Sequence, residues 1–178
     1  MIHSKTILLS GLTICLFFGA NYCFGSDPIL EAHASKLLGA REYTLQVAAL
    51  MPDSLFSYRP VEGEMAFGEQ LVHLADNLFW LSSSYVSEKP NPITTKADTK
   101  NMSKADICNY VNHAYDFAIE SIRNIDPESL TKEFDWNSTK LNKIQFLNLI
   151  QDHQTHHRAQ LLVYLRLNQL TPPRYIGW

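Results

Sequence analysis

The sequence predicts an all-α protein folded as a four-helix bundle, for two reasons. Apolar residues recur at helical spacing in four long segments. All 8 prolines lie between or outside these segments, where a missing N–H does no harm. Hydrophobic residues make up 46% and charged residues 19% of the 178 residues, which is ordinary for a globular domain with one core.

The first two helices are expected over residues 30–50 and 67–86. Leucines and alanines recur every three or four positions in the first helix, and Pro52 ends its pattern. Pro90 lies beyond the end of the second helix. One side of that helix carries Leu71, Leu74, Leu78 and Leu81. Each helix therefore has an apolar side to bury against the others.

The last two helices are expected over residues 104–125 and 141–168. Ser103, followed three positions later by Asp106, resembles a capping box at the start of the third helix. A Pro-Pro pair after the fourth helix prevents its continuation. These features define where the two helices begin and end.

Two connecting stretches are less regular. The connector over residues 87–103 is long for a tight turn. It could cross the bundle, which would make the second and third helices parallel, but helical spacing leaves that order open. Residues 132–136 alternate polar and apolar and are expected to be extended only briefly.

Residues 1–25 have the pattern of a signal peptide. Lys5 precedes a long uncharged stretch, and Cys23 and Gly25 are small residues at the −3 and −1 positions of a cut before Ser26. The stretch is short for a membrane span. We therefore expect an exported protein, periplasmic or secreted, whose mature domain covers residues 26–178 and has no membrane span. An uncleaved N-terminal anchor is the alternative.

Charge and cysteine content exclude two further classes of protein. The net charge is −3 and no basic run occurs, so no nucleic-acid partner is expected. Removal of the signal peptide leaves Cys108 as the only cysteine, so the mature chain has no intramolecular disulfide. A homodimer stays open, and the small-molecule substrate is not identified.

Histidines are the candidate metal ligands. His153 and His157 are four residues apart, so a helix places both rings on one face, where a single ion can satisfy them. His73, in an apolar part of the second helix, is a plausible third ligand from a different helix. The alternative is that these are hydrogen-bonded core histidines. His156 lies about 60° from the centre of the stripe, so its role is open.

Two motifs and a connector resemble the DinB/YfiT-like family of metalloenzymes. The motifs are Gln-Leu-Val-His-Leu-Ala-Asp around His73 and His-Gln-Thr-His-His-Arg-Ala-Gln-Leu from His153, and the connector covers residues 51–60. The resemblance spans about residues 30–170. The family usually has Gly where this chain has Ala159, a small residue that still allows close helix contact.

The resemblance implies an up-down-down-up bundle with a long crossover between the second and third helices. It also implies one divalent metal ion held by His73, His153 and His157. Imidazole ligands show little selectivity among Zn, Ni, Fe and Mn, so the metal is not identified. Beside these ligands, His156, Gln160 and Asn77 are candidates to support them or to face the substrate, and no catalytic base stands out.

Three functions are compatible with these features. The first is a metal-dependent hydrolase outside the cytoplasm, because three histidines leave positions on the ion open for water or substrate. The second is a thiol-dependent S-transferase or isomerase, an activity found in the family, although export would separate the protein from cytoplasmic thiols. The third is a non-catalytic metal-binding stress protein.

Overall fold

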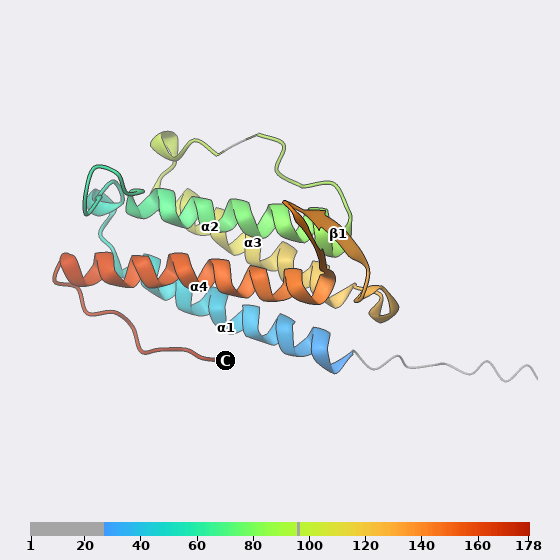
Figure 1. Ribbon diagram of the computed structural model, residues 1–178. Coiled ribbons are helices and arrows are strands. Elements are labelled where there is room, and N and C mark those ends of the chain that lie inside the picture. The colour runs from blue at the N-terminus through green and yellow to red at the C-terminus, as the bar shows by residue number, and fades with distance from the viewer. Residues whose placement is uncertain (1–26, 96) are drawn as a thin grey trace, which may run out of the picture.

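A computed structural model describes residues 27–95 and 97–178 of the chain. The expected signal peptide, residues 1–25, lies outside the described residues. Four helices form most of the fold (Figure 1): α1 Pro28–Leu50, α2 Phe67–Leu81, α3 Lys104–Arg123 and α4 Lys143–Leu167. The predicted four helices are therefore confirmed, with shifts of a few residues at their ends.

Helix starts follow ordinary capping chemistry. The Asp27 carboxylate accepts hydrogen bonds from the backbone N–H groups of Ile29 and Leu30, and Pro28 is the first residue of α1. Pro28 was expected outside the helix, but proline is tolerated in the first turn, because the N–H that it lacks would have no partner within the helix. The predicted Ser103–Asp106 capping box is present at the start of α3.

The helical bundle also carries a small hairpin, whose first strand lies within the stretch 132–136 that was expected to be briefly extended. Strands β1 (Glu133–Trp136) and β2 (Thr139–Asn142) pair antiparallel, with Trp136 opposite Thr139. Asn137 adopts a left-handed conformation with φ of 52° in the two-residue turn, as Asn tolerates better than most residues. Because residues 139–142 form a strand, α4 begins at Lys143, two residues later than expected from the sequence.

The end of the second predicted helix also differs in detail. Its last turns, Ser82–Ser87, are wound as a π-helix (η2). Three short 3₁₀ helices, η1 (Asp53–Leu55), η3 (Thr99–Asn101) and η4 (Pro127–Ser129), lie in the connections. The buried Lys143 ammonium donates to the Val86 carbonyl and contacts the Glu88 carboxylate at 3.0 Å, so the end of η2 is tied to the start of α4.

The core lies between the four helices. Helix α2 packs against α3 and α4, and α1 packs against the same two helices. Large side chains with almost no exposure, including Leu37, Phe67, Tyr115 and Phe146, come from all four helices. Between α2 and α3, the connector runs along the outside of the bundle from one end to the other (Figure 1). No helix in the described part of the chain has the length and apolarity to cross a membrane.

Candidate metal centre

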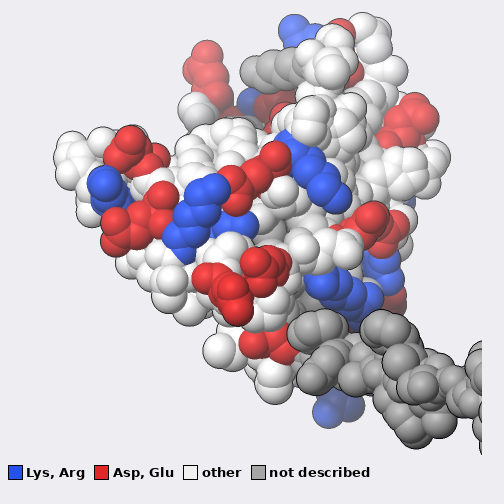
Figure 2. Space-filling model, turned by 90° about the vertical axis from the view of Figure 1, so that its right-hand side faces the viewer, with Lys and Arg blue, Asp and Glu red and all other residues white. Residues whose placement is uncertain are grey.

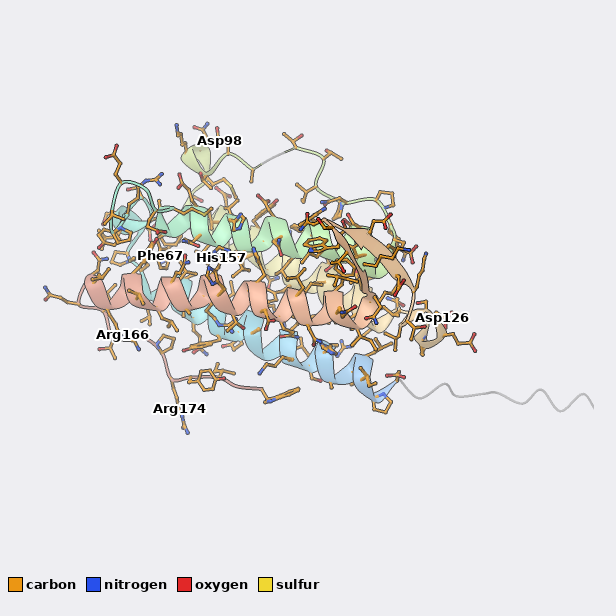
Figure 3. All side chains as sticks on the ribbon, viewed as in Figure 1. Phe67, Asp98, Asp126, His157, Arg166 and Arg174 are labelled. Atoms are coloured by element: carbon orange, nitrogen blue, oxygen red, sulfur yellow. The ribbon has the colours of Figure 1, made fainter. Side chains whose placement is uncertain are left out.

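Three imidazole rings meet between α2 and α4. His73 comes from α2, and His153 and His157 come from α4. One ring nitrogen from each lies within 4.8 Å of the others, and the ring centroids are 4.4 to 5.1 Å apart. Figure 3 places His157 between these two helices. The structure thus brings together the three histidines that the sequence singled out, which we call the histidine triad.

Burial keeps two rings of the triad uncharged. Desolvation, assisted by the neighbouring histidines, lowers the pKa of His153 to about 4 and the pKa of His157 to about 3. Both rings are therefore neutral near pH 7, and each has one nitrogen with an available lone pair. Metal binding needs this protonation state.

A chain of hydrogen bonds supports His157. Its Nδ1 lies 2.6 Å from Oε1 of Gln70, a buried residue of α2 one turn before His73. The Gln70 amide nitrogen donates to Oε1 of Gln160, and the Gln160 amide nitrogen lies 3.0 Å from Nε2 of His156. Gln70 Oε1 acts as an acceptor, so His157 Nδ1 carries the proton and Nε2 is left as the free ligand atom.

The residues proposed to surround the triad fall into two groups. Gln160 and His156 belong to the hydrogen-bond chain that reaches His157, and the His156 ring lies 5.0 Å from the His157 ring. Asn77 lies one turn after His73 and lines a pocket together with His153. Sequence reasoning missed Gln70, although its spacing of three residues from His73 already placed both on one helix face.

A second polar network connects the neighbouring face of α4 to α1 and α3. Gln154 accepts hydrogen bonds from the Tyr115 hydroxyl of α3 and, at 3.0 Å, from the Arg158 guanidinium. Tyr115 also lies 3.0 Å from the Thr44 hydroxyl of α1. Gln154 and Arg158 each follow a triad residue directly. This buried network therefore fixes the rotation of α4 that turns His153 and His157 toward α2.

Two cavities adjoin the triad. One, of about 330 Å³, is lined by His153 and Asn77, and the other, of about 250 Å³, by His73, Asp76 and Glu69. Both carboxylates in the second cavity have partners within the described chain. Glu69 contacts Arg59 at 2.6 Å, and Asp76 accepts a 2.6 Å hydrogen bond from the Tyr110 hydroxyl. Polar groups that could handle protons thus lie beside His73.

Cys108 and the surface charge bear on the competing functions. Cys108 is half-buried, and burial raises the pKa of its thiol, so it is protonated and a poor nucleophile near pH 7.

Figure 2 shows acidic and basic side chains of the described residues interspersed over one end of the bundle, without a broad patch of either sign. That face therefore offers no broad basic surface.

The triad has the donor chemistry of a divalent-metal site. Nitrogen ligands of a zinc-like ion would each lie about 2 Å from it, so the ligand nitrogens would have to come within about 4 Å of one another. Three rings whose nitrogens already lie within 4.8 Å of one another would meet this with small side-chain adjustments. One ring also has its other nitrogen hydrogen-bonded to an amide oxygen, an arrangement common among histidine ligands. The three histidines of the triad therefore fit a divalent metal ion.

The fold and the site define a four-helix bundle protein with a histidine triad between two of its helices. The sequence matches the DinB family over residues 30–175, which is most of the chain. This protein belongs to the DinB family.

Similar proteins are found in two Bacillus species. The chain is 22% identical over 135 residues to the uncharacterized protein YjoA of Bacillus subtilis (strain 168), covering 74% of this chain and 86% of YjoA. The YjoA crystal structure superposes with a TM-score of 0.68 at 20% identity, covering 82% of this chain and 97% of that one. A DinB-like protein from Bacillus cereus ATCC 10987 gives 0.69 at 21% identity, covering 82% and 96%. These structures support the fold.

Proposed function

We propose that this protein binds one divalent metal ion through His73, His153 and His157 and acts as a metal-dependent hydrolase outside the cytoplasm. The observation that carries the proposal is the convergence of three ring nitrogens from two helices within 4.8 Å. Isolated interior imidazoles would need separate polar partners, whereas one ion satisfies all three. Zn, Ni, Fe and Mn all suit such a ligand set.

Three protein ligands leave positions open on the ion, in contrast to a closed structural site. A divalent ion held there would polarise a substrate oxygen and lower the pKa of a bound water. The chain's own residues supply orientation and a proton acceptor. Gln70 holds the His157 ring in one tautomer, and Asp76, in the cavity beside His73, is the carboxylate we assign to proton transfer.

Two wider features belong to the same proposal. Export is inferred from residues 1–25, and the mature domain then covers residues 26–178. The helix order is taken to be up-down-down-up. The connector that runs the length of the bundle between α2 and α3 supports this order, because it lets both helices start at the same end (Figure 1).

Elemental analysis of the purified protein tests metal binding. We expect about one equivalent of a divalent metal per chain, and a large loss in His73→Ala. His33→Ala is the matched control, because His33 is a partly buried histidine of α1 outside the triad. Equal metal content in both variants, or metal-free wild-type protein after supply of all four metals, would refute the site.

Activity is tested with a panel of esters, amides and phosphoesters, with and without chelator. Chelator-sensitive turnover that is lost in Asp76→Asn, while metal content is kept, supports the hydrolase. Turnover only in the presence of an added low-molecular-weight thiol would replace it with the S-transferase or isomerase. Bound metal without any turnover would favour the non-catalytic metal-binding stress protein.

A further inference from the structure

The larger cavity beside the triad has features of its own. It measures about 330 Å³ and lies between α2, η2, α4 and the turn of the hairpin. His153 and Asn77 form one part of its lining, and Trp80, Tyr85, Trp136 and Asp135 form another. We call it the hairpin pocket. A molecule that fills this pocket would reach the His153 ring of the triad.

The aromatic wall of the hairpin pocket is rigid. Tyr85 stacks on the buried Phe146, with ring centroids 4.1 Å apart and an angle of 4° between the planes. Trp136 packs edge-on against the same ring at 5.4 Å, and Trp80 lies 5.6 Å from Trp136. These contacts fix the rings before any ligand arrives, which lowers the entropy cost of binding.

Trp80 is the exposed member of this wall. It is 42% exposed although it is one of the largest apolar side chains of the protein. A tryptophan left open beside a pocket is a common anchor for a ligand, because it offers a large apolar face at little conformational cost. Its π face is also negative and attracts cations.

The charged residues around the hairpin pocket also favour a cation. Asp135 and His153 are the only acidic or basic residues that line it among the described residues. No Lys or Arg nitrogen of the described chain lies within 4.0 Å of the Asp135 carboxylate. Lys140 is opposite Asp135 in the strand register, but it is not part of the lining. In the described part of the chain, the one full charge that this lining offers is therefore the negative charge of Asp135, an exposed residue of β1, and it disfavours an anionic ligand.

We propose that the hairpin pocket binds a small organic cation, a substituted ammonium group with an apolar body, through Trp80, Trp136 and Asp135. The cation site stands on the pocket alone. Its role in catalysis rests on the proposed function. A divalent ion held at the triad would repel a second positive charge, so the ammonium group would lie toward Asp135 and the bond to be cut toward His153. The substrate class is then an ester or amide that carries an ammonium group.

Three molecules of one shape test the charge preference: choline, its neutral isostere 3,3-dimethylbutanol, and the anion 3,3-dimethylbutanoate. Binding to the full chain, freed of metal by chelator, is measured by calorimetry and by tryptophan fluorescence. Trp178→Phe removes the tryptophan outside the pocket from the signal. We expect choline to bind about fivefold more tightly than the neutral isostere, and the anion most weakly.

Two substitutions on β1 test whether the charge preference comes from Asp135 in the pocket or from the net charge of the protein. Asp135→Asn should weaken choline binding about threefold or more and leave 3,3-dimethylbutanol unchanged. Glu133→Gln removes the same charge from an exposed position of β1 outside the pocket and should leave both unchanged. Trp80→Ala should weaken both ligands.

The results distinguish this inference from the proposed function. Equal affinity for the three probes, equal effects of the two strand substitutions, or no choline binding by folded protein would overturn the cation site. If this happens while the triad still binds metal, the metal site stands. If choline binds as expected and the protein takes up no metal, the cation site stands and the hydrolase proposal fails.

Discussion

Nδ1 of His157 on α4 and Oε1 of Gln70 on α2 lie 2.6 Å apart across the helix interface. Gln70 is almost completely buried, and its amide nitrogen is already directed to Gln160. The bond therefore runs in one direction, from the imidazole N–H to the amide oxygen. It selects one tautomer of His157 and ties the two helices that carry the triad.

Loss of this bond should weaken metal binding. Gln70→Leu removes the acceptor, so His157 loses its fixed tautomer, and we expect metal affinity to fall about 10- to 100-fold. Affinity is measured by competition with a chromogenic chelator. Gln70→Glu keeps an acceptor and should retain most of the affinity.

Two comparisons make this result interpretable. Gln46→Ala, at a partly exposed position of α1, should bind metal like the wild type. Circular dichroism checks that Gln70→Leu is folded, because unsatisfied Gln160 and His157 atoms also cost about 1–3 kcal/mol of stability. A folded Gln70→Leu protein with wild-type affinity would show that the bond has no part in metal binding.

The triad and its neighbour His156 should respond differently to substitution. His157→Ala removes a ligand, and we expect metal content to fall strongly and the gain in melting temperature on metal addition to disappear. His156→Ala is the matched control on the same helix, because its exposed ring contacts Gln160 and is not one of the three converging rings. Comparable metal loss in both variants would mean that His156 is a ligand or that the triad is not the site.

Sequence periodicity predicted the four helices because each buries one apolar side, and it predicted the juxtaposition of His153 and His157 because they lie one helical turn apart. The approach of His73 from another helix is a tertiary contact that spacing cannot provide. Its place in an apolar helix made it a plausible third ligand, and the family resemblance strengthened that prediction. The structure brings the three together. Whether they bind metal stays a prediction.

The role of Gln70 and the second strand of the hairpin could not be predicted from the sequence, for physical reasons. Gln70 is a polar residue in an apolar helix, and its role depends on a partner 87 positions away in the chain. Strand β2 contains only one apolar residue, Leu141, so the sequence shows no strand alternation there, and helical spacing extends the last helix back to residue 141. Asn137 followed by Ser138 is the local sequence signal for the turn, and the structure places Asn137 in the left-handed region.

The metal-free protein should lose stability in mild acid. The pKa values of His153 and His157 in the folded state are lowered to about 4 and about 3, below the unfolded value of about 6.5. Between these values the unfolded chain binds more protons than the folded one, so stability falls as pH drops from about 6.5 toward 4. This contribution is fully present above the unfolded pKa.

Urea unfolding at a series of pH values measures this effect. The double variant His153→Gln, His157→Gln should show a flatter pH profile over the same window, because the two groups that take up protons are gone. An equally steep profile in the double variant would assign the acid sensitivity to other groups.

The buried network behind the triad should matter for stability and, through it, for the site. Tyr115 is fully buried and connects Thr44 of α1 to Gln154 of α4. Tyr115→Phe leaves both partners without its hydroxyl, so we expect a loss of about 1–3 kcal/mol in the free energy of unfolding, measured in urea. Tyr175→Phe, at a position that is 73% exposed, should change stability little.

The same substitution should affect metal binding only indirectly. Gln154 is next to His153 on α4 but is not itself a proposed ligand, so metal affinity in folded Tyr115→Phe should fall only modestly. A loss as large as that of a missing ligand would mean that the network positions the triad more directly than its hydrogen bonds indicate.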